Sequence, residues 1–156
     1  MADAAVTPGD LRIESGRKLL EMTDAVGFGA VGAAWIHERD ADHWWYLLVT
    51  PMIDSKGPRW IYERLLPVFN KLRLPEGITP LDIRIISPQE QFFRKFPVKA
   101  KNNLPGPIPE LSLDRLMLPG FIPVDAAHVY RMDRDRQWAA ERAATFDRKV
   151  RELLAA

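Results

Sequence analysis

The run over residues 43–51 (His-Trp-Trp-Tyr-Leu-Leu-Val-Thr-Pro) constrains the fold more than any other part of this sequence. Successive side chains of a β-strand point to opposite faces of its sheet. In this run both alternations are apolar, one beginning at Trp44 and the other at Trp45. We therefore expect a strand that is covered on both faces and lies inside its sheet.

Three further segments have the composition of strands. Residues 30–38 are β-prone, and the four residues that separate them from the run at 43 have turn composition at hairpin length. Residues 82–87 and 126–132 are predicted as later strands, with room for a short one near 111–118.

Apolar residues at helical spacing predict helices over residues 8–25, 58–73 and 134–155. Pro67 is expected to kink the second helix or to end its regular part early, because proline lacks the backbone N–H. Residues 87–90 (Ser-Pro-Gln-Glu) match a capping box with proline at the first helical position. They predict a short helix through the phenylalanines that follow.

This order of elements predicts an α+β fold: a small mixed or antiparallel sheet, helices packed mainly on one face, and a long C-terminal helix over 134–155. A chain of 156 residues has the usual size of one domain, so we expect a single domain over 1–156. Six prolines fall within residues 97–123. They predict a proline-rich loop segment, since proline cannot donate to a sheet ladder.

Composition excludes several classes of function. With 47% hydrophobic and 28% charged residues the chain is typical of a globular protein, and a net charge of +1 indicates no particular partner. The absence of cysteine rules out disulfides, thiol nucleophiles and thiolate metal sites. The sequence shows no secretory signal and no apolar run near the roughly 18 residues of a membrane helix. We expect a soluble cytoplasmic protein that makes no use of a membrane.

Residues 27–32 (Gly-Phe-Gly-Ala-Val-Gly) match the G-x-G-x-x-G spacing of dinucleotide-binding loops. In such loops a strand precedes the glycines and an acidic residue follows about 20 positions later. Here a predicted helix precedes them, and positions 47–50 are Leu-Leu-Val-Thr. We interpret the motif as a helix stop followed by a tightly packed strand, and we expect no cofactor.

Two histidines, His37 and His43, flank the predicted hairpin turn together with Asp40 and Asp42. Imidazoles and carboxylates that meet at a turn could bind zinc or another divalent ion. Polar turns also collect these residue types where strands reach water, and His128 is distant in sequence. We expect no metal, and His37 and His43 are the candidate ligands if one binds.

Motifs for nucleophilic catalysis and phosphate binding are missing from the sequence. Its serines fall at helix, turn, cap and strand positions (Ser15, Ser55, Ser87 and Ser112), and none lies in a G-x-S-x-G elbow. The sequence thus favours no enzyme class, although an active site can assemble from residues that are distant in sequence.

The densest basic stretch comprises Arg94, Lys95, Lys99 and Lys101, within a segment (53–109) that has ten basic and five acidic side chains. Basic side chains neutralise phosphates, and the interleaved phenylalanines could stack on bases. The helical spacing of these phenylalanines instead favours burial in the core. Anion or nucleic-acid binding through residues 94–101 is the alternative function.

The C-terminal helix provides the main prediction of function. Its small and apolar residues recur at 4-3-4-3 spacing, which is typical of the seam between paired helices: Ala139, Ala143, Phe146, Val150 and Leu153. The same stripe would also suit a helix packed on its own sheet, and the sequence leaves this choice open. We predict a non-catalytic interaction module that self-associates or binds a protein partner through this helix. A small-molecule enzyme is the third possibility.

Overall fold

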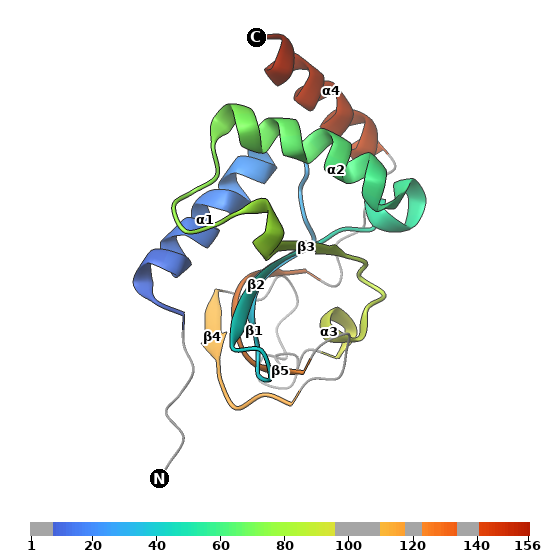
Figure 1. Ribbon diagram of the computed structural model, residues 1–156. Helices are drawn as coiled ribbons and strands as arrows, with labels where there is room; N and C mark the ends of the chain where they lie inside the picture. The colour runs from blue at the N-terminus through green and yellow to red at the C-terminus, as the bar shows by residue number, and fades with distance from the viewer. Residues whose placement is uncertain (1–7, 96–109, 118–122, 134–140) are drawn as a thin grey trace.

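The computed structural model describes residues 8–95, 110–117, 123–133 and 141–156. Four helices, one 3₁₀ turn and five strands lie along these residues (Figure 1). Their order is α1 (Asp10–Ala25), β1 (Gly32–Glu38), β2 (His43–Val49), α2 (Met52–Leu72), η1 (Pro80–Asp82), β3 (Ile83–Ile86), α3 (Gln91–Arg94), β4 (Leu111–Leu113), β5 (Val124–Met132) and α4 (Glu141–Ala155). The predicted α+β class is confirmed.

The five strands form one mixed sheet in the order β3-β2-β1-β5-β4. β2 and β3 run parallel, and the other neighbours are antiparallel. β2 therefore lies inside the sheet between β1 and β3, and its side chains from Tyr46 to Val49 are buried. The prediction made from its two apolar alternations is confirmed.

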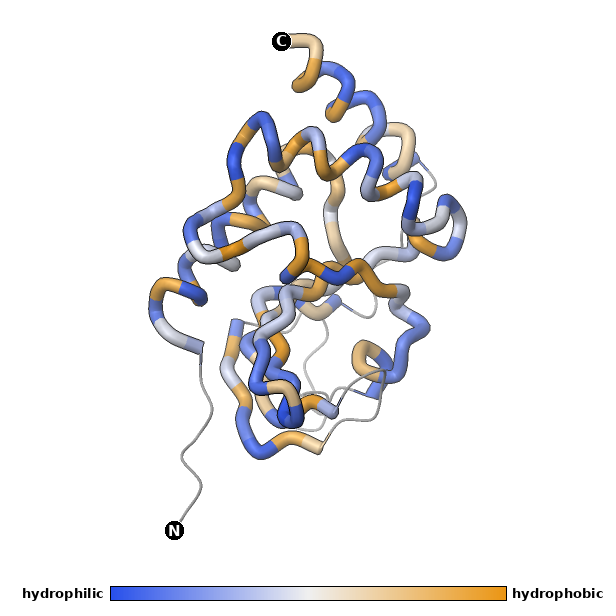
Figure 2. The backbone as a smooth tube through the Cα atoms, viewed as in Figure 1, coloured by the Kyte–Doolittle hydropathy of each residue, from blue (hydrophilic) through white to orange (hydrophobic). Residues whose placement is uncertain are grey.

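Each face of the sheet carries its own hydrophobic cluster. α1, α2 and α4 belong to the cluster on one face, around Trp35 and Tyr46, and the short α3 covers the other face with Phe92 and Phe93 (Figure 1). Hydrophobic and hydrophilic positions alternate along α2 and α4 (Figure 2). This pattern is typical of helices that bury one side and expose the other. The longer helices thus lie on one face, as predicted.

α1 packs closely on the sheet at Gly16, which has no side chain. Three aromatic side chains of the sheet donate hydrogen bonds to its backbone carbonyls: Trp35 to Arg12 (2.9 Å), Tyr130 to Ile13 (2.6 Å) and Tyr46 to Gly16 (2.8 Å). A Cβ at position 16 would lie 2.5 Å from Trp35 Nε1 and would also overlap Tyr130. Close packing therefore accounts for a glycine inside a helix.

The glycines at 27–32 form the connection between α1 and β1. Gly27 and Gly29 adopt positive φ angles of 81° and 54° directly after α1, and their backbone leads into β1. A Cβ at Gly32 would lie 2.9 Å from the ring of Phe93. Because a helix precedes these glycines, the structure gives them the geometry of a helix stop and a close packing contact.

α2 differs from its prediction at both proline and glycine. It begins at Met52, six residues earlier than expected, and its non-helical backbone lies at Gly57 (φ 83°). Helical backbone continues through Pro67 to Leu72, so the expected early end at Pro67 is wrong. The flexible glycine takes up the change of direction, since a positive φ is readily available only to it.

The capping box expected at residues 87–90 is also wrong. Ser87 Oγ accepts from the backbone N–H of Gln89 and donates to Asp54, while α3 begins at Gln91 after the cap residue Glu90. A capping box lies instead at η1, where Thr79 and Asp82 bond reciprocally. The hydroxyl of Ser87 stabilises a turn.

Parts of two predictions lie outside the described residues. These are most of the proline-rich segment 97–123 and the first seven residues of the helix expected over 134–155. In the part that is described, α4 runs from Glu141 to Ala155 and packs on α2, with its C-terminal end projecting beyond α2 (Figure 1). No helix within the described ranges has the length and apolar character needed to cross a membrane.

Candidate functional site

Two buried histidines lie on the helix-covered face of the sheet. The register pairs Trp35 of β1 with His128 of β5, and His37 with Ala126. Glu38 pairs with Val124, so Asp125 is the extra residue of a β-bulge. The bulge turns Asp125 towards the His37 ring, which places a carboxylate on this face.

His37 is held between two carboxylates. Its Nδ1 lies 2.7 Å from Asp125 Oδ1 and its Nε2 lies 2.7 Å from Asp42 Oδ1, while the residue is only 4% exposed. Burial lowers the pKa of His37, but the hydrogen bonds to Asp125 and Asp42 outweigh burial and hold this pKa above its ordinary value. The arrangement favours an imidazolium with both N–H groups donating.

His128 has almost the same burial and different neighbours. Its Nδ1 is hydrogen-bonded with Ser112 Oγ of β4, and its Nε2 lies 3.6 Å from Glu110 Oε2. Among the described residues this buried Nε2 has no hydrogen-bond partner. Burial lowers the pKa of His128 below its ordinary value against the attraction of Glu110. A neutral imidazole with its proton on Nε2 fits these contacts, and the Ser112 hydroxyl then donates a hydrogen bond to Nδ1.

Glu110 connects the second histidine to α1. Arg17 donates to both of its oxygens, at 2.7 and 3.3 Å, and Arg17 also pairs with Glu14 on its own helix. The hydrogen bond from Arg17 lowers the pKa of Glu110, so this group stays ionised. The carboxylate near His128 is therefore shared with a guanidinium, which weakens its pull on the imidazole.

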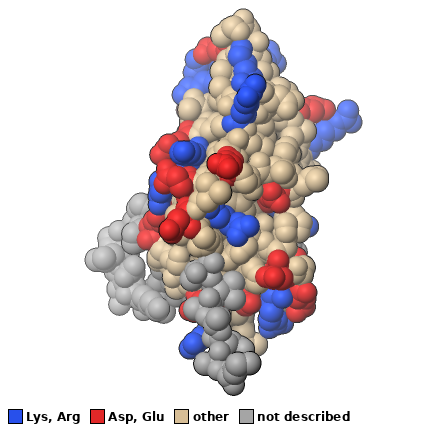
Figure 3. Space-filling view, turned by 60° about the vertical axis from the view of Figure 1, so that its left-hand side comes forward, with Lys and Arg blue, Asp and Glu red and all other residues tan. Residues whose placement is uncertain are grey.

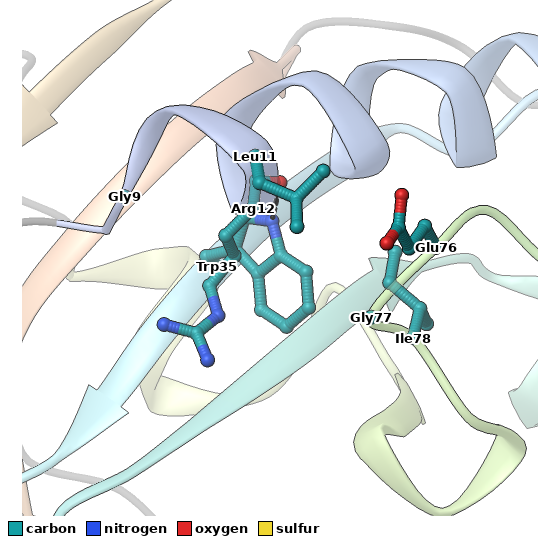
Figure 4. A pocket seen from close by; sticks show the side chains of 7 residues that line it. All are labelled: Gly9, Leu11, Arg12, Trp35, Glu76, Gly77 and Ile78. Carbon is teal, nitrogen blue, oxygen red and sulfur yellow. Dashed lines mark hydrogen bonds between the residues drawn. The ribbon is translucent and has the colours of Figure 1, made fainter.

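A cavity opens between α1 and the loop that precedes η1. Its volume is about 220 Å³, and its lining comprises Gly9, Leu11, Arg12, Trp35, Glu76, Gly77 and Ile78. Figure 4 shows the Trp35 ring between the Arg12 guanidinium on one side and the loop residues Glu76 and Ile78 on the other. The Arg12 guanidinium lies 5.6 Å from the centroid of Trp35 and 5.7 Å from that of Trp44.

The surface around this cavity combines exposed apolar and charged groups. Leu11 is 56% exposed at its mouth, and Leu81, three residues after Ile78, is 85% exposed. Figure 3 brings this side of the molecule forward and shows acidic and basic side chains interspersed on it. Such a surface has apolar anchors without a single dominant charge.

The predicted interface stripe on α4 faces the chain's own core. Ala143, Phe146 and Val150 are buried, and the ring of Phe146 packs edge-on to Phe28 at 5.3 Å. Leu153 is half-buried against the same cluster, and Ala139 lies outside the described residues. The structure thus matches the alternative that the stripe packs within the chain, and an association through α4 would use other side chains.

The predicted basic site is described only in part. Arg94 and Lys95 are exposed at the end of α3, whereas Lys99 and Lys101 lie outside the described residues. Phe92 and Phe93 are buried in the second hydrophobic cluster. They are therefore unavailable for stacking on bases.

The two candidate metal ligands do not converge. His37 bonds to Asp42 and Asp125, whereas the ring of His43 packs on Trp45 and its Nε2 lies 3.6 Å from Asp82. Over the described stretches, no three His, Asp or Glu side chains are grouped so that they could hold a metal ion.

Sequence reasoning missed most of the residues that form this site. Ser112, Glu110 and His128 come together only through the register of β4 with β5, and Arg12 meets Trp35 only because α1 crosses the sheet. A histidine at 128, flanked by apolar residues on both sides in the sequence, was the available signal, because a buried polar residue needs partners. Comparisons with known proteins found no matching family model, no matching curated protein and no matching solved structure.

Proposed function

We propose that this chain is an interaction module that binds a protein partner at the cavity beside Arg12 and Trp35. The site would accept one apolar side chain of the partner next to a carboxylate. This proposal keeps the function predicted from the sequence and moves its site from α4 to the N-terminal half of α1.

The position of Arg12 carries the proposal. Its guanidinium lies over the two indoles of Trp35 and Trp44, and no carboxylate among the described residues pairs with it. Cation–π contacts occupy the faces of these rings and leave the guanidinium N–H groups free to donate. An arginine whose guanidinium N–H groups are free suits a bidentate contact with a carboxylate.

The dimensions of the cavity support an apolar anchor. A cavity of about 150 Å³ holds a benzene molecule, so about 220 Å³ accommodates one leucine or phenylalanine side chain. Leu11 and Ile78 supply apolar walls, and tryptophan and arginine are the residue types most enriched at binding hot spots.

Site-specific photo-crosslinking tests the proposal. Benzoylphenylalanine is placed at Leu11, at the mouth of the cavity, and in a second variant at Leu154, an exposed position on α4. We expect a defined protein adduct from position 11 that is reduced at least fivefold by Arg12→Gln, and none from position 154. Adducts from position 154 alone would support the α4 interface, and no adduct from either position would overturn the proposal.

Binding through the exposed cations of α3 is the second candidate, and Arg94 with Lys95 supports it. Phosphate contacts weaken steeply as salt rises, with a slope close to one per contact. Binding to a mixed-sequence single-stranded DNA at low salt, lost in the variant Arg94→Gln with Lys95→Gln, would favour it. Failure of the parent protein to bind at low salt would remove it.

A further inference from the structure

Ser112 is the exposed member of a hydrogen-bonded pair that the interaction role does not use. Ser112 lies on β4 directly opposite His128 of β5, and the two side chains share a hydrogen bond on the same face of the sheet. On the far side of the ring, His128 Nε2 faces Glu110 Oε2 at 3.6 Å. A hydroxyl, an imidazole and a carboxylate thus stand in line.

We propose that Ser112 is an activated nucleophile that accepts acyl groups from small carboxylic esters, with His128 as its general base and Glu110 as the carboxylate that attracts the imidazolium form of His128. The order of the three groups is that of a serine nucleophile, its base and a carboxylate beyond the base. The imidazole is used in its other orientation, with Nδ1 towards the serine. The inference concerns the β4 edge of the sheet and does not rest on the proposed partner site.

Burial of His128 gives the imidazole the state that this role needs. A base must be neutral to take the hydroxyl proton, and burial holds the pKa of His128 below its ordinary value. Ser112 itself is exposed on an edge strand, so a small ester reaches its oxygen. The buried, otherwise unpaired Nε2 of His128 is the position where the imidazolium formed in the reaction would gain from Glu110.

Every bond and proton of the reaction is accounted for by Ser112, His128, the ester and one water molecule. Ser112 Oγ forms a bond to the ester carbonyl carbon while its proton passes to His128 Nδ1. The tetrahedral adduct collapses with cleavage of the bond to the alkoxy oxygen, and His128 returns the proton to the departing alcohol. Water then attacks the acyl-serine with His128 again as base, which releases the carboxylic acid and restores the hydroxyl.

Other contacts decide against a phosphoryl donor. The nearest guanidinium, Arg17, is engaged by Glu110 and Glu14, so it is not free to neutralise a transferred phosphoryl group. Acyl transfer instead requires only the nucleophile, the base and its orienting acid for the proton steps.

Labelling with a fluorophosphonate, followed by mass spectrometry of the intact protein and of its peptides, tests the proposal. Ser87 is the matched control, since its hydroxyl bonds to the Asp54 carboxylate without an imidazole. We expect one adduct on Ser112 that forms at least tenfold faster than any adduct on Ser87. It should be lost in Ser112→Ala, slowed at least tenfold in His128→Gln, and unchanged in Ser87→Ala.

The role of Glu110 is separated from a structural one by rescue. Glu110→Gln should slow labelling while leaving the melting curve within a few degrees of the parent, and Glu110→Asp should restore part of the rate. Hydrolysis of p-nitrophenyl acetate should follow the same order of variants. A parent protein that takes no label, or a label that persists in Ser112→Ala, overturns the proposal even if His128→Gln does not fold.

Discussion

His37 and His128 lie on neighbouring strands and the same face of the sheet, with exposures of 4% and 5%, yet their pKa values move in opposite directions. Burial acts on both in the same sense, because it disfavours the charged imidazolium. The partners of the two imidazoles differ as well. This comparison shows that equal surface exposure gives no common protonation state.

The carboxylates that face the two histidines differ in number, in their distance from the ring, and in whether another side chain also binds them. His37 has two carboxylates at 2.7 Å, whereas His128 has one at 3.6 Å that Arg17 also holds. A charge-assisted hydrogen bond at short distance offsets the desolvation of an imidazolium, while a shared carboxylate beyond hydrogen-bond distance does not. His37 is therefore suited to hold the hairpin end of the sheet, and His128 to accept a proton.

Gly16→Ala is expected to have the largest effect, and to act on one histidine only. The new methyl group would overlap Tyr130 and Trp35 and push α1 away from the sheet, which costs about 3 kcal/mol of stability. His128, whose ring packs on Tyr130 at 4.9 Å, would become more solvated, so its pKa should rise towards the ordinary value. The pKa of His37 should stay unchanged.

Urea unfolding and an NMR titration of the histidine Hε1 signals measure both effects. Gly9→Ala is the control, because nothing lies within 4 Å of a Cβ at Gly9. An unchanged pKa of His128 in a destabilised Gly16→Ala protein would show that α1 does not supply its burial.

Removal of one carboxylate charge at each histidine should have unequal effects. Asp125→Asn leaves the His37 cation with a single, exposed partner, and we expect a loss of about 2 kcal/mol in the free energy of unfolding. Glu110→Gln should cost clearly less, because His128 is neutral and the Arg17–Glu110 pair is exposed to solvent. Denaturant titrations at pH 7 measure both, and equal losses would contradict the assignment of opposite charge states.

The sequence predicted the sheet better than it predicted the site. β-prone composition identified β1 and two apolar alternations identified β2, each within two residues at both ends, because many residues of a strand contribute to the same local pattern. The break in α2 at Gly57 and the turn made by Ser87 were missed. At Ser87 the capping signal competed with a turn, and a contact with Asp54, 33 residues away in sequence, accompanies the turn.

The site depends on contacts that no local pattern encodes. Asp125 reaches His37 across 88 residues through a bulge, and Arg17 reaches Glu110 across 93 residues. The α4 stripe shows a second limit of sequence patterns. The spacing correctly identified Phe146 and Val150 as buried. It could not show whether they pack on the same chain or on another one.

The pH dependence of stability should separate the two histidines. Between the ordinary pKa of 6.5 and the raised pKa of His37 the folded state binds more protons, so stability from His37 falls as pH rises. Between 6.5 and the lowered pKa of His128 the unfolded state binds more protons, so stability falls as pH falls. His37→Gln should flatten the profile above pH 6.5, and His128→Gln should flatten it below.

Urea midpoints at half-unit steps from pH 5.5 to 8.5 measure these profiles. The ordinary pKa values of Asp and Glu side chains lie below this range. The two flattened limbs should appear in different variants. If one variant flattened both, the two histidines would titrate as a coupled pair and the contrast between them would fail.

The smallest effect is expected from Asp42→Asn, and it tests whether His37 needs both carboxylates. Asp42 is 94% exposed at its side chain, so water screens its attraction, whereas Asp125 is 21% exposed. Asparagine tolerates the positive φ of 47° at this position and can still accept from Nε2–H. The pKa of His37 should therefore fall only part of the way towards 6.5, with little change in the melting temperature.

Asp40→Asn, which alters a neighbouring exposed carboxylate paired with Arg39, is the control in the same NMR titration. A pKa of His37 at or below 6.5 in Asp42→Asn would mean that the exposed carboxylate, and not the bulge residue Asp125, separates this histidine from His128.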